Sequence, residues 1–287
     1  MRNILVLGGD CRQIAVAEEF SKGGDKVRLY GFEDEYISSG CLKAGNLSEA
    51  VKECDMIIAG LPATTDGETV NAPLFTGKIY IDEIIKHISS DSLFIGGMLS
   101  EEIKNKFRGV CKTADYCLCE ELIIKNVVPT VEGAVAIAIN ETPFTLNKSK
   151  CLVAGYGRIG KYLSRILSAM NAEVTVSARK RRDFAWLDCF ALKYTDTGKI
   201  YETAGEYNII FNTVPYLVID KKCIDNLDKD CVIIDLASKP GGIDFSYAAK
   251  KGIKVVWALS LPGKTAPVTA GRIIKEATDN LLKDMGV

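Results

Sequence analysis

Histidine is nearly absent from this chain, in which His87 is the only one. A zinc site that uses histidines would have one such ligand at most, and a serine–histidine or cysteine–histidine nucleophile would depend on this single side chain. His87 stands in the segment IIKHISSDS, whose apolar spacing predicts a helix. We therefore expect a surface or packing role for it, and no metal site in the protein.

Long apolar runs and an excess of one charge are also missing. No run approaches the roughly 18 apolar residues of a membrane span. The N-terminal segment MRNILVLGGD faintly resembles a secretion signal, but its apolar part is short and a Gly-Gly-Asp turn follows at once. The 36 basic and 37 acidic residues give a net charge of −1, so no overall field favours nucleic acid or an anionic membrane. We expect a cytoplasmic protein that binds neither.

Cysteine pairs with the spacing of a metal or redox site are missing as well. The chain has ten cysteines, yet no C-x-x-C occurs among them. They are scattered, mostly within apolar segments. This pattern favours reduced, partly buried thiols in a reducing compartment.

What the chain does contain is an alternation of short β-branched runs with helical patterns. Its 287 residues exceed what one core usually covers, which favours two domains. Strand–helix alternation is typical of doubly wound parallel sheets. The expected strands are Asn3–Leu7, Lys26–Tyr30, Asp55–Ala59, Leu93–Ile95, Lys150–Ala154, Glu173–Ser177, Tyr207–Phe211, Cys231–Asp235 and Lys254–Trp257.

The two halves resemble each other weakly, because NILVLGGDCRQIA and KCLVAGYGRIGKYL both predict a strand, a glycine turn and a helix. The predicted fold is therefore α/β, with two Rossmann-like doubly wound parallel-sheet domains joined by two helical crossings. The first domain spans 1–125 and regains a C-terminal helix at 265–287. The second spans 126–264 and includes a connecting helix that Pro143 ends. A cleft is expected between the domains.

The clearest motif is GYGRIG, which follows the strand KCLVA and opens a helix. In such a motif the first glycine permits a tight turn and the second lets the backbone approach a pyrophosphate. The third lets helix and strand pack closely. The helix N-terminus then offers N–H groups and a partial positive charge to the phosphates. The alternative is a glycine turn that binds nothing.

The next strand ends in the stretch VTVSARKRRDF. NAD-binding domains place an acidic residue at this strand end for the ribose 2′-hydroxyl, but here Arg179 and Lys180 follow. A carboxylate about 4 Å from a 2′-phosphate would be repelled by about 4 kcal/mol per charge at a surface-like dielectric, whereas a guanidinium forms a bidentate pair. We therefore predict NADP, with Ser177 as a further donor and Arg181 and Arg182 as surface residues. A solvated basic loop is the alternative.

Two later strands end in FNTVP and IDLASKPGG. Ligands of doubly wound sheets bind at such carboxyl ends. Asn212 and Thr213 are expected near the ribose or nicotinamide, and Pro215 is expected to shield the nicotinamide from water. The predicted cofactor-binding set is Gly155, Tyr156, Gly157, Arg158, Ile159, Gly160, Ser177, Arg179, Lys180, Asn212, Thr213, Val214, Pro215, Leu236, Ala237 and Ser238.

The first domain carries GGDCR, which lacks the third glycine, so we do not predict a second dinucleotide site there. Its strand-end loops offer Thr64, Thr65 and Ser100 as hydrogen-bond donors to substrate carboxylates, and Arg12 as a cationic clamp. A turn or helix-cap role is the alternative for each of them.

General acid–base catalysis needs a titratable group near the reacting carbon. With histidine effectively excluded, the candidates are Lys264, Lys239, Glu132 and Asp10, and the sequence does not choose among them. The two lysines would enter the cleft from the second domain.

Six segments, in this order along nearly the whole chain, resemble the dipicolinate synthase A subunit family: GGD-x-RQ, ATT-x-GE, PTVEGA, G-x-G-R-x-G, DLAS-x-PGG-x-D and LPG-x-x-AP-x-TAG. The resemblance implies an NADP-linked oxidoreductase subunit that works with a second, flavoprotein-like dipicolinate synthase B subunit. Together they would convert a dihydro- or hydroxytetrahydrodipicolinate of the lysine pathway to dipicolinate, the pyridine-2,6-dicarboxylate. The expected place is the mother cell of a sporulating bacterium. No catalytic residue is carried over.

The predicted residues suit that chemistry. Removing hydride from a dihydropyridine gives an aromatic ring, so the enzyme mainly has to hold the ring against the nicotinamide and remove a proton. Two substrate carboxylates need two clamps, for which Arg12, the two threonines and the two lysines are of the right type. Arg272 is a further candidate, with a helix-surface role as its alternative. Self-association is left open.

Two other functions compete with this one. A different two-domain NADP-dependent dehydrogenase, similar to methylenetetrahydrofolate or alanine dehydrogenase, would share the fold and the motif. A hydroxy-acid dehydrogenase would need a catalytic histidine, and His87 is poorly placed. The chain would alternatively be a non-catalytic regulatory subunit that senses NADP.

Overall fold

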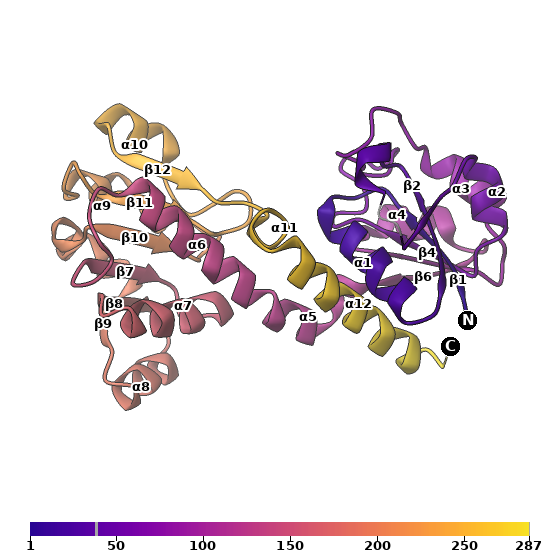
Figure 1. The fold of residues 1–287 in the computed structure, drawn as a ribbon. Helices are drawn as coiled ribbons and strands as arrows, with labels where there is room; N and C mark the ends of the chain where they lie inside the picture. Colours follow the sequence, from indigo (N-terminus) through magenta and orange to yellow (C-terminus); the bar gives the residue numbers. More distant parts are fainter. Residues whose placement is uncertain (38–39, 287) are drawn as a thin grey trace. The chain divides into compact units, whose positions relative to one another are not determined.

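The structure is a computed structural model that describes residues 1–37 and 40–286. The chain divides into two compact units, one comprising Met1–Asn126 with Ala266–Val287 and the other Val127–Thr265. Each unit contains a six-stranded parallel sheet with helices (Figure 1). The predicted α/β fold with two Rossmann-like sheets, linked at two helical crossings, is confirmed.

The first unit has the strand order β3-β2-β1-β4-β5-β6. Its strands are β1 (Asn3–Leu7), β2 (Lys26–Tyr30), β3 (Leu42–Lys43), β4 (Met56–Ala59), β5 (Leu93–Gly96) and β6 (Lys112–Asp115). Its helices are α1 (Cys11–Lys22), α2 (Leu47–Lys52), α3 (Ile81–His87), α4 (Glu101–Phe107), α5 (Glu120–Lys125) and α12 (Pro267–Asp284), with short 3₁₀ turns at η1 (Asp34–Tyr36) and η2 (Tyr116–Leu118).

The apolar strand β1 explains why this sheet is covered on both faces. Successive side chains of a strand point to opposite faces. Ile4 and Val6 join a core cluster with residues of α1 and α12, whereas Leu5 and Leu7 join a second cluster with residues of α2, α3 and α4. The C-terminal helix α12 is therefore part of the first unit. Its residue Ile274 is fully buried in the core of that unit.

The second unit has the strand order β12-β11-β10-β7-β8-β9. Its strands are β7 (Lys150–Ala154), β8 (Glu173–Ala178), β9 (Lys193–Asp196), β10 (Ile209–Asn212), β11 (Val232–Asp235) and β12 (Lys254–Trp257). Its helices are α6 (Val127–Glu141), α7 (Arg158–Ala169), α8 (Arg181–Cys189), α9 (Lys221–Asp225), α10 (Phe245–Lys251) and α11 (Leu261–Thr265), with 3₁₀ turns at η3 (Thr197–Glu202) and η4 (Ala204–Glu206).

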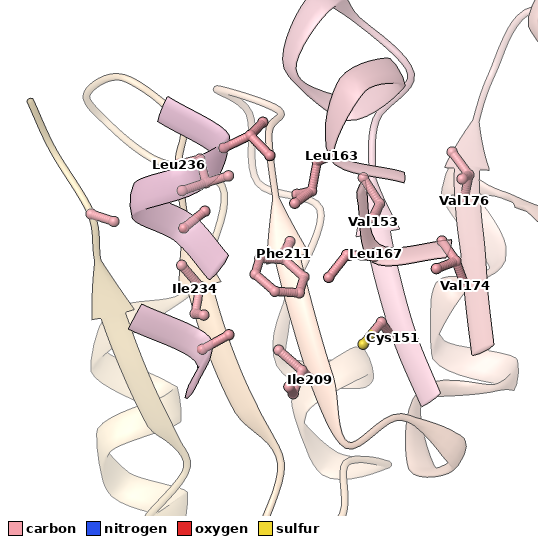
Figure 2. Close-up of a cluster of buried hydrophobic side chains, with 14 of the residues drawn as sticks. Cys151, Val153, Leu163, Leu167, Val174, Val176, Ile209, Phe211, Ile234 and Leu236 are labelled. Atoms are coloured by element: carbon pink, nitrogen blue, oxygen red, sulfur yellow. The ribbon is translucent and has the colours of Figure 1, made fainter. Parts of the chain in front are cut away.

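The order of the second sheet reverses between β7 and β10, which creates a topological switch point. Helix α7 leaves β7 at this point and packs back onto the sheet. Figure 2 shows Leu163 and Leu167 of α7 pointing at the sheet, where they join Val153 and Phe211 in one buried cluster. The packing holds the start of α7 beside the carboxyl ends of the central strands.

One helical segment, Glu120–Glu141, is long and apolar enough to span a membrane by length and composition alone. It comprises α5 and α6, and the charged residues Lys125 and Glu132 inside it interrupt its apolar runs. Val131, Ala134 and Ala138 of α6 are fully buried in the core of the second unit. Packing within the unit accounts for the apolar character of this part of the segment.

Thiol reactivity should distinguish exposed from buried cysteines. Cys11 and Cys189 are exposed, while burial raises the pKa of Cys151 and Cys231 to about 12. Only the thiolate reacts rapidly with disulfide reagents. At about pH 8 we expect such a reagent to modify Cys11 and Cys189 within minutes in the folded protein, and all ten thiols after denaturation. Rapid modification of Cys151 in the native chain would contradict the packing.

Candidate functional site

A pocket of about 470 Å³ opens in the second unit at the carboxyl ends of β7, β8 and β10. It lies at the topological switch point, where doubly wound sheets bind their ligands. We call it the strand-end pocket. Its lining consists of Gly155, Tyr156, Gly157, Arg158, Lys161, Ala178, Arg179, Lys180, Arg182, Asp183, Thr197, Thr213, Val214, Pro215 and Tyr216.

The three glycines of the motif stand in three different local environments, which the position of an added Cβ atom shows. Gly155 has φ of +99°, and a Cβ there would lie 2.6 Å from the Thr213 hydroxyl oxygen. A Cβ on Gly160 would lie 2.1 Å from the carbonyl oxygen of Gly155, so this glycine permits α7 to approach β7. A Cβ on Gly157 would meet no atom within 4 Å. The first and third glycines thus serve the fold, and the second leaves open space beside the pocket backbone.

The start of α7 adds an anion-binding feature. Gly157 is the N-cap of this 12-residue helix, and no side chain within residues 1–37 and 40–286 caps the helix end. The first N–H groups of a helix have no partner within the helix, and the helix dipole places partial positive charge there. A phosphate group beside Gly157 would accept hydrogen bonds from these groups.

The side chains around the pocket are predominantly basic. Five cationic residues line the pocket, and Asp183 is the acidic residue of the lining. A concave site lined mainly by one sign of charge attracts ligands of the opposite sign. The lining therefore suits a ligand that carries several phosphates. The five cationic residues are Arg158, Lys161, Arg179, Lys180 and Arg182.

Several lining residues were not predicted from the sequence. Arg182 lines the pocket, although a surface role was expected, whereas Arg181 lies outside the lining as predicted. Lys161 follows Arg158 by three residues on α7, so helical spacing was a usable signal for it. Asp183 and Thr197 had no such signal.

Two residues predicted to bind the cofactor are buried outside the pocket lining, where they form hydrogen bonds with lining residues. Ser177 is fully buried and outside the lining, and its hydroxyl oxygen accepts a hydrogen bond from the Thr197 hydroxyl at 3.2 Å. Asn212 is also fully buried, and its Nδ2 donates to the carbonyl oxygen of Val214 at 2.9 Å while its Oδ1 accepts from the Val214 N–H at 3.1 Å. Both side chains therefore form hydrogen bonds within the protein and lie outside the pocket lining, and their predicted roles at the cofactor stay predictions.

A buried carboxylate connects the loops that follow β10 and β11. Asp235 has no exposed surface, and it accepts hydrogen bonds from Asn212 Nδ2 at 2.8 Å and from the N–H groups of Ala237 and Gly242 at 3.0 Å. Unpaired buried donors are costly, so this carboxylate fixes both loops. The other predicted cofactor residues outside the lining are Ile159, Gly160, Leu236, Ala237 and Ser238.

A second cavity of about 250 Å³ adjoins the strand-end pocket and shares Arg179 and Thr197 with it. Apolar and aromatic side chains form much of its remaining wall, among them Ile200, Tyr201 and Leu217. Leu217 is 61% exposed, which leaves its side chain available to a ligand. A flat ring of nucleobase size suits such walls, with the Arg179 guanidinium as a stacking partner.

The first unit brings strand-end loops together in another way. The Arg12 guanidinium is buried and donates to both carboxylate oxygens of Asp10, at 2.9 and 2.8 Å, and to the carbonyl oxygen of Leu61 at 2.6 Å. Arg12 therefore joins the loops after β1 and β4. Nε and Nη2 thus have partners inside the unit, and the role of Arg12 as a substrate clamp stays a prediction.

The predicted hydroxyl donors take local roles in part. The Thr64 hydroxyl lies 3.1 Å from Asp66 Oδ1 and accepts from the Gly67 N–H, while Ser100 caps α4. Hydrogen bonds from Thr69 and Glu68 lower the pKa of the Asp66 carboxyl. Thr65 is exposed and remains available. The turn and cap alternatives thus describe Thr64 and Ser100.

A second buried carboxylate in the first unit resembles Asp235. Asp115 accepts hydrogen bonds from the N–H groups of Met98 and Leu99 at 3.1 and 2.8 Å, which fixes the turn after β5, and from the Cys117 N–H at 2.8 Å, which caps η2. Gln13 Nε2 is buried without a hydrogen-bond partner among the described residues. The sequence analysis assigned no role to Asp115, and it used Gln13 only as part of the motif GGD-x-RQ.

The three predicted catalytic residues all belong to the second unit and are exposed. Lys264 lies on α11 and Glu132 on α6, whereas Lys239 lies in the loop after β11. None of them lines the strand-end pocket. The fourth candidate, Asp10, is paired with Arg12. The geometry therefore does not select the acid–base group.

Comparisons with known proteins find relatives that share the fold of this chain and a family whose sequences resemble it. Residues 3–117 match the family model for the N-terminal domain of the dipicolinate synthase A subunit. The chain is 30% identical over 286 residues to the dipicolinate synthase A subunit of Bacillus subtilis (strain 168), which covers 98% of this chain and 96% of that protein. The crystal structure of the corresponding protein from Bacillus halodurans has a TM-score of 0.88 at 27% identity, over 98% of this chain and 97% of that one. A transhydrogenase from Sinorhizobium meliloti shares the fold, with a TM-score of 0.72 at 16% identity over 98% of this chain and 94% of that one.

Proposed function

The chain belongs to the dipicolinate synthase A subunit family, and we propose that it is an NADP-dependent oxidoreductase that makes dipicolinate with a flavoprotein-like B subunit. Its substrate would be a dihydro- or hydroxytetrahydrodipicolinate from the lysine pathway, used during sporulation. The observation that carries the proposal is the strand-end pocket, where an open glycine backbone and five cations lie at the switch point. The relative in Bacillus subtilis is named as one subunit of a synthase, which itself implies a partner.

The residues present suit three parts of NADP: its pyrophosphate, its 2′-phosphate and its adenine. The pyrophosphate would bind at Gly157 and the uncapped start of α7. Arg179, Lys180 and Arg182 would bind the 2′-phosphate, and the adjoining cavity would hold the adenine. Bound NADP supplies the acceptor for the hydride that leaves the substrate.

The chain itself has to bind, orient and deprotonate the substrate. Product formation yields an aromatic ring, so positioning supplies most of what catalysis requires. In the second unit, we propose the exposed side chains Lys239 and Lys264 as donors to the substrate carboxylates. Glu132 and the two lysines remain our candidates for accepting the proton.

The first experiment mixes the purified chain with enzymatically generated hydroxytetrahydrodipicolinate and NADP⁺, with and without the B subunit. NADPH formation and dipicolinate absorbance are followed together, and NAD⁺ is run in parallel. Both signals rising, with NADP⁺ preferred, would support the proposal. Neither signal with the B subunit present would contradict it and favour another NADP-linked dehydrogenase.

A regulatory role has one observation in its favour, because no predicted acid–base residue lines the pocket. A nucleotide-site variant of the chain distinguishes the roles. If the chain only senses NADP, then the B subunit should still form product when the chain carries that variant. If the chain is catalytic, then product formation should stop.

Replacing Arg179 by alanine is expected to weaken NADPH binding about 10- to 100-fold and NADH binding much less, because NADH loses only the proposed stacking contact with the adenine. Hydrogen bonds to charged groups contribute about 1.5–3 kcal/mol, and about 1.4 kcal/mol corresponds to a factor of ten. Fluorescence titration with both nucleotides at fixed ionic strength measures the effect. Arg181→Ala is the matched control, because Arg181 is a neighbouring arginine outside the lining. Equal weakening of NADPH and NADH would argue against a 2′-phosphate contact.

A further inference from the structure

Three large aromatic side chains lie exposed on α8, at its C-cap and on β9 in the second unit. Trp186, Phe190 and Tyr194 are 54%, 56% and 42% exposed. Trp186 and Phe190, one helical turn apart, stack with ring centroids 5.8 Å apart, and Tyr194 stacks on Phe184 at 5.0 Å. Single exposed aromatics are common, whereas clustered ones mark interaction surfaces. We call these three residues the α8–β9 patch.

The patch borders an open edge of the sheet. Strand β9 is the last strand in the order and pairs with β8 on one side only. Among the described residues, no other strand pairs with its outer side. An edge strand presents unpaired N–H and C=O groups that another strand can join. Aromatic surface and free backbone groups thus lie next to each other.

We propose that the α8–β9 patch is the interface with a second copy of this chain. In the proposed dimer, β9 pairs antiparallel with β9 of the second copy, about a two-fold axis perpendicular to the sheet. Such a rotation keeps both copies of α8 on the same face of the joined sheet. The helices would lie side by side, so that Trp186 and Phe190 of one copy meet those of the other.

The charges of β9 permit this self-pairing. Directly opposite residues of an antiparallel pair share one face, so an axis at Tyr194 places Tyr194 opposite its own copy and Lys193 opposite Thr195. No two like charges then face each other directly. Lys193 also has Glu173 at 3.9 Å, which offsets its charge at the edge. Aromatic cross-strand pairs such as Tyr194 with Tyr194 are favourable.

The available area indicates a reversible dimer. About half of each aromatic side chain is exposed, and buried aromatics contribute about 150–250 Å² each, so two copies would bury about 600 Å² of aromatic surface. Stable interfaces bury about 1,200–2,000 Å² in total. The patch supplies roughly half of the lower limit, and the strand edge with its flanking side chains has to supply the rest. We therefore expect a concentration-dependent dimer.

Sedimentation velocity of the full chain, from about 1 to about 200 µM, tests the proposal. The wild type should shift from monomer towards dimer over this range. Tyr194→Lys, which places two ammonium groups on the axis, and Trp186→Ser should each weaken dimerisation at least about tenfold. Neither residue lines the strand-end pocket, so NADPH affinity should stay unchanged and report correct folding.

Leu42→Lys is the matched control, because Leu42 is a 60% exposed residue on the edge strand β3 of the first unit. This variant should dimerise like the wild type. Hydrogen exchange on the wild type gives a test without any variant, since amides of Lys193–Asp196 should gain protection as the concentration rises.

Two outcomes would overturn the proposal. One is a wild-type chain that stays monomeric over the whole range, or whose dimer survives both substitutions with no protection at β9. The other is a monomeric wild type that binds the B subunit and loses it through Tyr194→Lys. That result would assign the α8–β9 patch to the B subunit instead.

Discussion

Gly157→Ala is expected to weaken NADPH binding about 10- to 100-fold while it leaves the unfolding temperature nearly unchanged. The residue has φ of −80°, which alanine adopts without strain, and its Cβ would meet no protein atom within 4 Å. The same Cβ would stand where the backbone must approach the pyrophosphate. Thermal unfolding without ligand and fluorescence titration with NADPH measure the two effects separately.

Gly160→Ala is the matched control, with the opposite structural environment. Its Cβ would lie 2.1 Å from the carbonyl oxygen of Gly155, so α7 has to move away from β7. Overpacking of this kind costs about 1–3 kcal/mol or more. We expect this variant to lose stability as well as nucleotide affinity. If Gly157→Ala bound NADPH as tightly as the wild type, the strand-end pocket would not be the pyrophosphate site.

The contrast between these glycines shows how far the motif alone could be interpreted. The pattern GYGRIG assigned a role to each glycine, and the geometry at Gly155 and Gly160 fits a tight turn and close helix packing, whereas the pyrophosphate role of Gly157 stays a prediction. The basic strand end likewise predicted Arg179 and Lys180 in the pocket lining. Both inferences depend only on which residues follow a strand, and parallel strands bring those residues to one edge of the sheet.

The direction in which a side chain points could not be predicted from its position in the sequence. Ser177 and Asn212 occur at strand ends, as the sequence indicated, but their side chains are buried. A strand end can direct a side chain to either face of the sheet, and no alternation distinguishes the faces when both are apolar. Arg12 differs again, because the capping geometry of α1 turns its guanidinium onto Asp10.

The strands that the sequence missed are β3, β6 and β9, which all lie at sheet edges. Interior strands such as β1 and β11 have apolar residues on both faces and were expected within one residue of their observed bounds. The segments KTAD and KYTD have few apolar residues, because an edge strand packs less against the core. Hydrophobic patterns therefore predicted the interior strands of each sheet but missed the edge strands β3, β6 and β9.

Asp235→Asn is expected to lower the free energy of unfolding by about 2–5 kcal/mol and to weaken NADPH binding. The carboxylate accepts three hydrogen bonds, and an amide would place its NH₂ group against at least one of those donors. Asn212 would lose its hydrogen bond to Asp235. Its hydrogen bonds to Val214, which lines the strand-end pocket, would weaken as a result. Urea unfolding and NADPH titration measure the two consequences.

Asp115→Asn makes the same change in the first unit and separates stability from nucleotide binding. Asp115 also accepts three hydrogen bonds, but two of them fix the loop after β5 and the third caps η2. We therefore expect a comparable loss of stability with unchanged NADPH affinity, because every residue of the strand-end pocket belongs to the second unit. Equal loss of nucleotide affinity in both variants would mean that the carboxylates act through general destabilisation. A loss confined to Asp235→Asn would identify Asp235 as the residue that positions the pocket wall.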